Sequence, residues 1–172
     1  MTAASGIVAG ARILASAGRN AYPQAVVKTI DETEGVLDAS PATLVNDLEL
    51  NLPVAASTTY LFSCYLYYTG NNTGSHGGVE YEWVVPSGSL LRYSAIGSAF
   101  GGTVQVHATQ QAGTRYQVDT PTGSSMAEVM LGTLVTSTLA GTLQLTWSTY
   151  QDVGGHSTIH AQSFLALWQL SP

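Results

Sequence analysis

Residues 141–147 (GTLQLTW) constrain the fold of this chain more than any other stretch. Polar and apolar residues alternate strictly along it, with Leu143, Leu145 and Trp147 in the apolar positions. Side chains alternate between the two faces of a sheet along a β-strand, so this period predicts a strand with one buried face. A chain that contains such a strand must supply other strands to pair with it.

Short apolar segments of this kind recur along most of the chain. Glycine, proline, asparagine and serine fill the connections, and no long segment has the 3.6-residue period of a helix. Pro53 lacks the backbone N–H that a central strand needs, so we expect the first segment to end there. The spacing predicts an all-β fold, an antiparallel β-sandwich of the jelly-roll kind. The segments interpreted as strands are 44–52, 58–68, 79–85, 90–96, 103–108, 115–118, 128–136, 142–150 and 158–170.

The chain has 172 residues, which suits one domain with a substantial core. Residues 1–40 are irregular and rich in alanine, glycine and serine. We interpret them as an extended N-terminal arm or a loosely docked first strand around Val26, Val27 and Ile30. Residues 41–172 are assigned to the sandwich domain.

The charge pattern argues against two classes of partner. Charged residues make up 9% of the chain, the formal net charge is −6, and Lys and Arg together number five. So few cations cannot supply the phosphate contacts that drive nucleic-acid binding, and an anionic membrane would repel the chain. We expect no nucleic-acid ligand, and with no apolar run of about 20 residues we expect no membrane span. The single cysteine, Cys64, excludes an intrachain disulfide and is interpreted as a core residue.

The usual signatures of catalysis and metal binding do not occur in the sequence. No serine has the flanking glycines of a nucleophile elbow, and Lys28, the only lysine, is not part of a phosphate-binding loop. His156 and His160 lie four residues apart, which in a strand separates them by about 13 Å, too far to share one zinc ion. We therefore predict no catalytic residues, no metal site and no cofactor.

The acidic residues are expected to lie in solvent. The one cluster of charges contains Asp31, Glu32 and Glu34, followed by Asp38, and is interpreted as a solvated loop. Contact with a basic patch of a lattice, or with a cation, is the alternative. Asp47 and Glu49 share one strand face, and we expect them to lie on an outer face that is exposed to solvent.

Two strands carry apolar residues on both faces. Tyr65 and Tyr67 have the parity opposite to that of Phe62, and Phe164 and Trp168 repeat the pattern in the last strand. An antiparallel sheet normally has one solvated face, so a second apolar face indicates a subunit contact or a covering arm. A β-bulge that shifts the parity midway is the alternative. The candidate interface residues are Tyr65, Tyr67, Phe164 and Trp168.

Several motifs in a fixed order point to a family. They are residues 43–54 (TLVNDLELNLPV), 83–88 (WVVPSG), 141–147 and 163–167 (SFLAL), together with Ala56, Tyr60 and Phe62. This set resembles a β-sandwich module found in virion structural proteins of tailed bacteriophages, and the resemblance covers roughly residues 26–170. It implies a capsid-decorating, tail or fibre protein, typically a trimer, without catalytic residues.

The chain departs from the fibre members of that family because it has neither heptads nor a Gly-X-Y run. We therefore expect a non-enzymatic capsid decoration or minor capsid protein that binds the major capsid protein or other virion proteins as a homotrimer. It would be assembled in the bacterial host cytoplasm and located in the virion. The alternative is a tail, fibre or adhesion module that binds a host glycan through exposed aromatic residues. The candidate sugar-binding residues are Trp83, Tyr93, Tyr116 and Tyr150.

Overall fold

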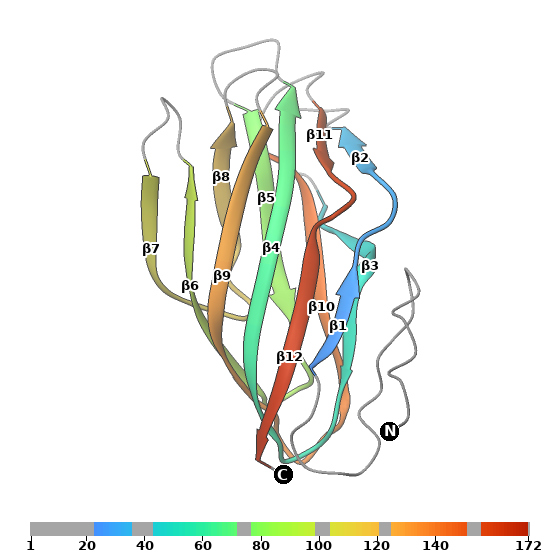
Figure 1. The fold of residues 1–172 in the computed structure, drawn as a ribbon, viewed down its shortest axis with the longest axis vertical. Helices are drawn as coiled ribbons and strands as arrows, with labels where there is room; N and C mark the ends of the chain where they lie inside the picture. Colours follow the sequence, from blue (N-terminus) through green and yellow to red (C-terminus); the bar gives the residue numbers. More distant parts are fainter. Residues whose placement is uncertain are drawn as a thin grey trace, which may run out of the picture.

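The computed structural model describes residues 23–35, 43–71, 77–98, 104–120, 125–150 and 156–171. All regular structure in these residues is β-strand (Figure 1). The bounds of the strands are β1 (Gln24–Val27), β2 (Glu32–Gly35), β3 (Val45–Val54), β4 (Thr59–Asn71), β5 (Gly77–Val84), β6 (Leu90–Ser98), β7 (Val104–Gln111), β8 (Tyr116–Thr120), β9 (Ser125–Val135), β10 (Gly141–Tyr150), β11 (His156–Ile159) and β12 (Phe164–Ser171).

The strands pair as one long hairpin. The first strand of the described chain pairs with the last, the second with the last but one, and this continues inward to the hairpin β6/β7 at the middle. Every one of these pairs is antiparallel. The chain therefore forms a double ribbon, and the fold arises when that ribbon bends over on itself.

Bending the ribbon produces two packed sheets. An eight-stranded sheet has the order β1-β12-β4-β9-β6-β7, with β11 paired with β4 and β2 paired with β11, and a four-stranded sheet has the order β3-β10-β5-β8. The larger sheet lies in front in Figure 1, with β7 at one edge and β1 at the other. A double ribbon wrapped into two antiparallel sheets is a jelly roll, so the predicted all-β sandwich is confirmed.

The core lies between the two sheets. Leu143, Leu145 and Trp147 are fully buried there, as their alternation predicts. The ring of Trp83, from the four-stranded sheet, meets the ring of Phe62 edge-on at 5.1 Å between centroids. Its Nε1 donates a hydrogen bond to the Met130 Sδ at 3.4 Å. Aromatic rings thus join the sheets at the centre of the sandwich.

Strand β3 differs from its sequence pattern in two ways. It runs through Pro53, which pairs with Thr142, because β3 is an edge strand and its other side needs no backbone donor. The register against β10 also slips, and across the slip Asp47 is buried while Leu48 is 72% exposed. The expectation that Asp47 keeps an outer face wet is therefore wrong, because the irregularity turns its side chain inward.

The other departures lie at the two ends of the chain. The predicted strand over 158–170 is interrupted by a turn in which Gln162 has a φ of +75°, so two strands, β11 and β12, replace one. Residues 24–27, where the sequence predicts an arm or a loosely docked first strand, form β1 and pair with β12. Residues 1–22 and 36–42 lie outside the described residues.

The doubled apolar faces do not come from a bulge in β4. The register between β4 and β9 is continuous from Thr59 to Thr69, and burial alternates without a break over the same residues. In β12 the register with β4 is regular as far as Gln169. The residues that face away from the core are therefore truly on the outer face.

Gly132, in β9, makes room for the aromatic core. A Cβ at this position would lie 2.1 Å from the Arg92 carbonyl oxygen and 2.6 Å from the Tyr93 Cα. The neighbours of Gly132 across both flanking strands are Phe62 and Tyr93, whose rings pack at 5.8 Å between centroids. The missing side chain thus lets β6 approach closely while the two rings cover the gap.

We predict that Gly132→Ala lowers the free energy of unfolding by at least about 2 kcal/mol, because the backbone of β6 must move to admit a methyl group. Gly97→Ala is the matched control, since its Cβ would meet only the side chain and carbonyl of neighbouring strand residues at 3.3 Å or more. Urea denaturation of both variants measures the difference. Equal losses would show that the close approach at Gly132 is not a constraint.

Candidate functional site

The four candidate interface residues lie together on the outer face of the eight-stranded sheet. Tyr65 pairs with Phe164 across β4 and β12, and their rings are stacked with centroids 6.0 Å apart. Trp168 is 37% exposed and pairs with Leu61. The ring of Tyr67 packs against the imidazole of His160 at 4.7 Å. The structure thus brings these side chains onto one surface, which we call the aromatic half of the face.

The apolar surface extends well beyond the residues found from sequence. One row of register partners crosses six strands from edge to edge, and all of its members are apolar or aromatic. The row is Val27, Phe164, Tyr65, Val129, Ile96 and Val106. We call it the apolar row. Val106, at its end on β7, is 70% exposed.

The second part of this surface is aliphatic. Val129 and Leu131 from β9, Ile96 from β6 and Val106 from β7 are each at least 40% exposed. We call these four residues the aliphatic half of the face. The sequence holds a signal for it, because Val129 and Leu131 have the parity opposite to that of the buried Met130. The positions in β6 and β7 can be assigned to this surface only when their register with β9 is known.

The outer face carries almost no charge. Among the described outward positions of β1, β12, β4, β9 and β6, Arg92 is the one charged side chain. Glu128 points into the core, Glu80 and Glu82 lie on the four-stranded sheet, and Asp31 contacts His160 beside Tyr67. The two outer faces of the sandwich therefore differ, one apolar and one polar.

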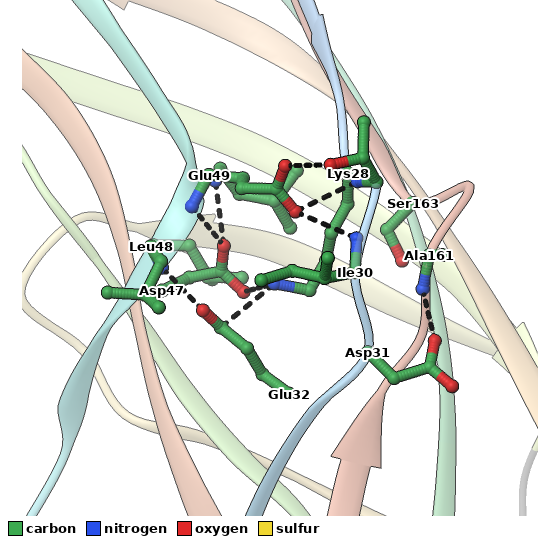
Figure 2. Close-up of polar contacts among 12 residues, drawn as sticks. Lys28, Ile30, Asp31, Glu32, Asp47, Leu48, Glu49, Ala161 and Ser163 are labelled. Carbon is green, nitrogen blue, oxygen red and sulfur yellow. Dashed lines mark hydrogen bonds and ion pairs between the residues drawn. The ribbon is translucent and has the colours of Figure 1, made fainter. Parts of the chain in front are cut away.

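A buried cluster of charged side chains holds the end of β1 against β3 of the four-stranded sheet (Figure 2). The Lys28 Nζ lies 3.0 Å from the Asp47 Oδ2 and 2.8 Å from the Glu32 Oε2. The side chains of Lys28 and Asp47 have no exposed surface. Glu32 in turn accepts a hydrogen bond from the Leu48 backbone N–H at 3.0 Å. Lys28 directly follows β1 and Asp47 belongs to β3, so the cluster ties an edge of one sheet to an edge of the other.

Backbone groups complete this cluster. The Asp47 Oδ1 accepts hydrogen bonds from the backbone N–H groups of Glu49 and Leu50, at 3.0 and 2.7 Å. The Glu49 carboxylate accepts from the backbone N–H groups of Thr29 and Ile30, at 2.8 and 3.1 Å. Glu32 and Glu49 were both expected in solvent, and each instead helps to hold the segment after β1 against β3. Asp38 lies outside the described residues, and Glu34 lies in β2.

A second buried acid lies between the sheets. Glu128 is fully buried on the inner face of β9, and its Oε2 accepts a hydrogen bond from the Tyr81 hydroxyl at 2.9 Å. Its Oε1 has no partner, and the buried hydroxyls of Tyr68 and Tyr93 have none either. Burial, partly opposed by the Tyr81 hydrogen bond, raises the pKa of Glu128 to about 7. A carboxyl in such a place is more stable in its neutral form.

The groups around Glu128 do not titrate near neutral pH. Burial raises the pKa of Cys64 and Tyr68 on β4, of Tyr81 on β5 and of Tyr93 on β6, and the Glu128 charge raises each further. Cys64 is thus a buried thiol in the core, as predicted. Glu128 is the group in this set whose charge changes in the physiological range.

Asp31, His160 and Thr69 form a carboxylate–imidazole–hydroxyl chain. The Asp31 Oδ2 lies 3.3 Å from the His160 Nδ1, and the His160 Nε2 lies 3.1 Å from the Thr69 Oγ1. Acyl transfer also needs backbone donors aimed at an oxyanion beside the nucleophile. Thr69 sits inside β4 and pairs with Ser125 and Thr158 on its two sides, so the backbone around it belongs to the sheet. The chain joins the loop before β2 to the turn after β11, and we interpret it as structural.

Metal and membrane sites find no support in the described part of the chain. It contains no group of three or more His, Cys, Asp or Glu residues placed to hold a metal ion. None of its segments is a helix long and apolar enough to cross a membrane.

We predict that Lys28→Met lowers the free energy of unfolding by about 3–5 kcal/mol, because it leaves the Asp47 carboxylate buried without its cation. The double variant Lys28→Met/Asp47→Asn should lose less than the sum of the two single losses, since it removes both charges. Urea denaturation gives all three values. Arg92→Met, which removes an exposed cation, is the control and should change stability by about 0.5 kcal/mol or less. Additive losses in the double variant would show that the two charges are not coupled.

We predict that Glu128 makes stability fall as pH rises. Its pKa is raised on folding, so its favourable contribution is complete below the ordinary value of 4.5 and is lost as the pH passes through about 7. The loss by about pH 8 should be on the order of 3 kcal/mol. Glu128→Gln, which keeps an acceptor for Tyr81, should lack this component, whereas Glu82→Gln on the outer side of β5 should keep it. The measurement is urea denaturation from about pH 4.5 to about pH 8, and identical pH profiles for wild type and Glu128→Gln would contradict it.

No family model matches this chain, and no curated protein matches it. Among solved structures, one of the Gx strain of infectious bursal disease virus is 12% identical, with 99% of this chain and 43% of that chain aligned and a TM-score of 0.23. A VP2 subviral particle of the same virus gives 10% identity, 98% and 42% coverage and a TM-score of 0.21. A bacterial lipoprotein of Bacteroides thetaiotaomicron gives 9% identity, 95% and 94% coverage and a TM-score of 0.24. This chain spans less than half of the two viral chains, and TM-scores this low mean that the backbones do not superpose.

Proposed function

We propose that this protein is a non-enzymatic structural protein of a virion, namely a capsid decoration or minor capsid protein of a tailed bacteriophage. In this role it binds the major capsid protein or other virion proteins, forms a homotrimer and stabilises the head lattice. It is assembled in the bacterial host cytoplasm and ends in the virion. The observation that carries the proposal is the apolar row, which crosses the larger sheet of a jelly roll with no acidic residue among the described positions of that face.

The chemistry of the two faces supports an assembly role. A face with this much apolar surface is costly to leave in water, so it indicates a partner surface. The opposite face carries polar side chains on neighbouring strands, among them Glu82, Gln117 and the buried Glu80, which is paired with Arg115. The resemblance of residues 26–170 to virion modules suggests that this face makes its contacts in a virion.

The glycan-binding alternative loses two of its four candidate residues. Trp83 is fully buried and Tyr93 is 2% exposed, so neither ring is available to stack on a sugar. Tyr116 is half-buried and packs on Tyr81 with centroids 5.5 Å apart. The side chain of Tyr150 lies outside the described residues. Among the described residues, Tyr65, Tyr67, Phe164 and Trp168 reach the surface on the proposed assembly face, and Tyr116 is half-buried on the other sheet.

We predict that antibodies against the protein label the heads of the phage particles that carry it, and that purified protein binds heads assembled without it. Leu131→Asp, in the apolar face, should weaken that binding at least about tenfold, because it places a charge in a desolvated contact. Thr142→Asp, an exposed position on β10 in the four-stranded sheet, is the control and should bind as the wild type does. Electron microscopy and co-sedimentation give the readouts.

Two results would overturn the proposal. One is particles that lack the protein altogether when the wild-type gene is present. The other is ester, glycan or peptide turnover that disappears in both His160→Ala and Thr69→Val, which would make the Asp31–His160–Thr69 chain a catalytic group.

A further inference from the structure

We infer that the outer face of the eight-stranded sheet is the contact between copies of this chain, with the aromatic half of one copy packed on the aliphatic half of the next. The inference deepens the proposed function, on which it rests for the setting of the assembly. The partner is a second copy, and the surface on each copy is the apolar row with its neighbours. Each copy then uses both of its halves.

The size of the face fits a contact between subunits. Six strands about 4.8 Å apart make the apolar row about 24 Å wide, and the outward residues of β4 from Leu61 to Tyr67 add about 20 Å along the strands. The product is about 500 Å² in projection, and side chains that stand out from the sheet raise the accessible area above that. Stable contacts bury about 800 Å² on each partner, whereas the largest apolar patch on a monomer is about 300–600 Å². The whole face is thus near the upper end for a monomer, and in a ring each contact uses about half of it on either copy, so the side chains around the face must add to the buried area.

The charges favour another copy as the occupant. Each chain carries a net charge of −6, so two copies repel each other over most of their surfaces. On this face the described outward positions carry no acidic residue and one basic residue, Arg92. Copies that meet here keep most of their acidic groups apart, and the exposed carboxylate beside the aromatic half is Asp31, which is already paired with His160. A partner recognised through charge would find few groups to pair with on this face.

The two halves differ in shape as well as in chemistry. The aromatic half is built on large flat rings, with Tyr65 and Phe164 stacked on each other. The aliphatic half presents the smaller, branched side chains of Val129, Leu131, Ile96 and Val106. Large groups pack best against smaller ones, since the two sets then interdigitate without voids. A head-to-tail contact between unlike halves closes into a ring when the rotation between successive copies permits it, and a ring of three copies is the homotrimer of the proposed function.

The experiment uses the purified full chain and needs no capsid. Wild type should be an oligomer at micromolar concentration by light scattering and sedimentation velocity. Trp168→Asp disables the aromatic half and Val106→Asp disables the aliphatic half, and each alone should raise the dissociation constant at least about tenfold. Val106 is 70% exposed, so its substitution leaves the core intact. Thr142→Asp adds the same charge to the four-stranded sheet and should leave association unchanged, and near-ultraviolet circular dichroism checks that every variant is folded.

Mixing the two disabled variants gives the decisive readout. Trp168→Asp keeps a sound aliphatic half and Val106→Asp keeps a sound aromatic half, so the mixture should form a heterodimer that neither variant forms alone. A mixture that stays monomeric while wild type associates would overturn the pairing of unlike halves. Wild type that remains an 18.0 kDa monomer at about 100 µM, yet still binds phage heads, would overturn the inference and the homotrimer, and would leave the capsid-binding role standing. An oligomer that fails to bind heads would support the inference and overturn the proposed capsid-binding role.

Discussion

The pairing of the first strand with the last is the constraint on which the rest of this structure depends. This pair encloses all the others, which nest inside it down to the hairpin β6/β7. Ends this far apart in sequence are expensive to bring together, because the loop-closure entropy is lost before distant contacts repay it. The Lys28 cluster lies where that cost is greatest. It joins the end of β1 to β3 in the other sheet, and the backbone N–H of Lys28 also donates to the Ser163 carbonyl beside β12, at 2.7 Å.

Two of the buried acids, Asp47 and Glu128, meet the cost of desolvation in different ways. Asp47 keeps a cation and two backbone donors, so its charge is compensated in the interior. Glu128 has one tyrosine donor and an unpartnered oxygen, so its neutral form is favoured. Asp47 therefore fixes the geometry of a sheet edge, while Glu128 makes the core sensitive to pH. Both side chains point to the inner side of their strands, away from water. A charged group occupies such a position only when hydrogen bonds or an ion pair compensate its lost hydration.

The sequence predicts the features that depend on local alternation. Leu143, Leu145 and Trp147 are buried because the period of a strand alone decides their face. The doubled faces at Tyr65 and Phe164 follow from the same rule. The inward orientation of Asp47 does not follow from this rule, because it depends on a register slip between β3 and β10. Its ion pair with Lys28 joins residues 19 positions apart in the sequence. The aliphatic half could not be predicted from the sequence for a related reason. Ile96 and Val106 lie beside Val129 only because of the register between β6, β7 and β9.

A period of two lets one strand serve two tasks. Along β4, Phe62, Cys64 and Leu66 face the core, and the residues between them face outward toward the proposed partner. Selection on the outward set can change assembly while the inward set keeps the fold, because the backbone of the sheet separates them. The same separation bears on the low charge of the chain. A sandwich with one solvated face needs charged residues on that face alone, so a protein whose second face is covered by its own copies needs few of them. Under the proposed assembly, the 9% of charged residues and the apolar row are two consequences of one arrangement.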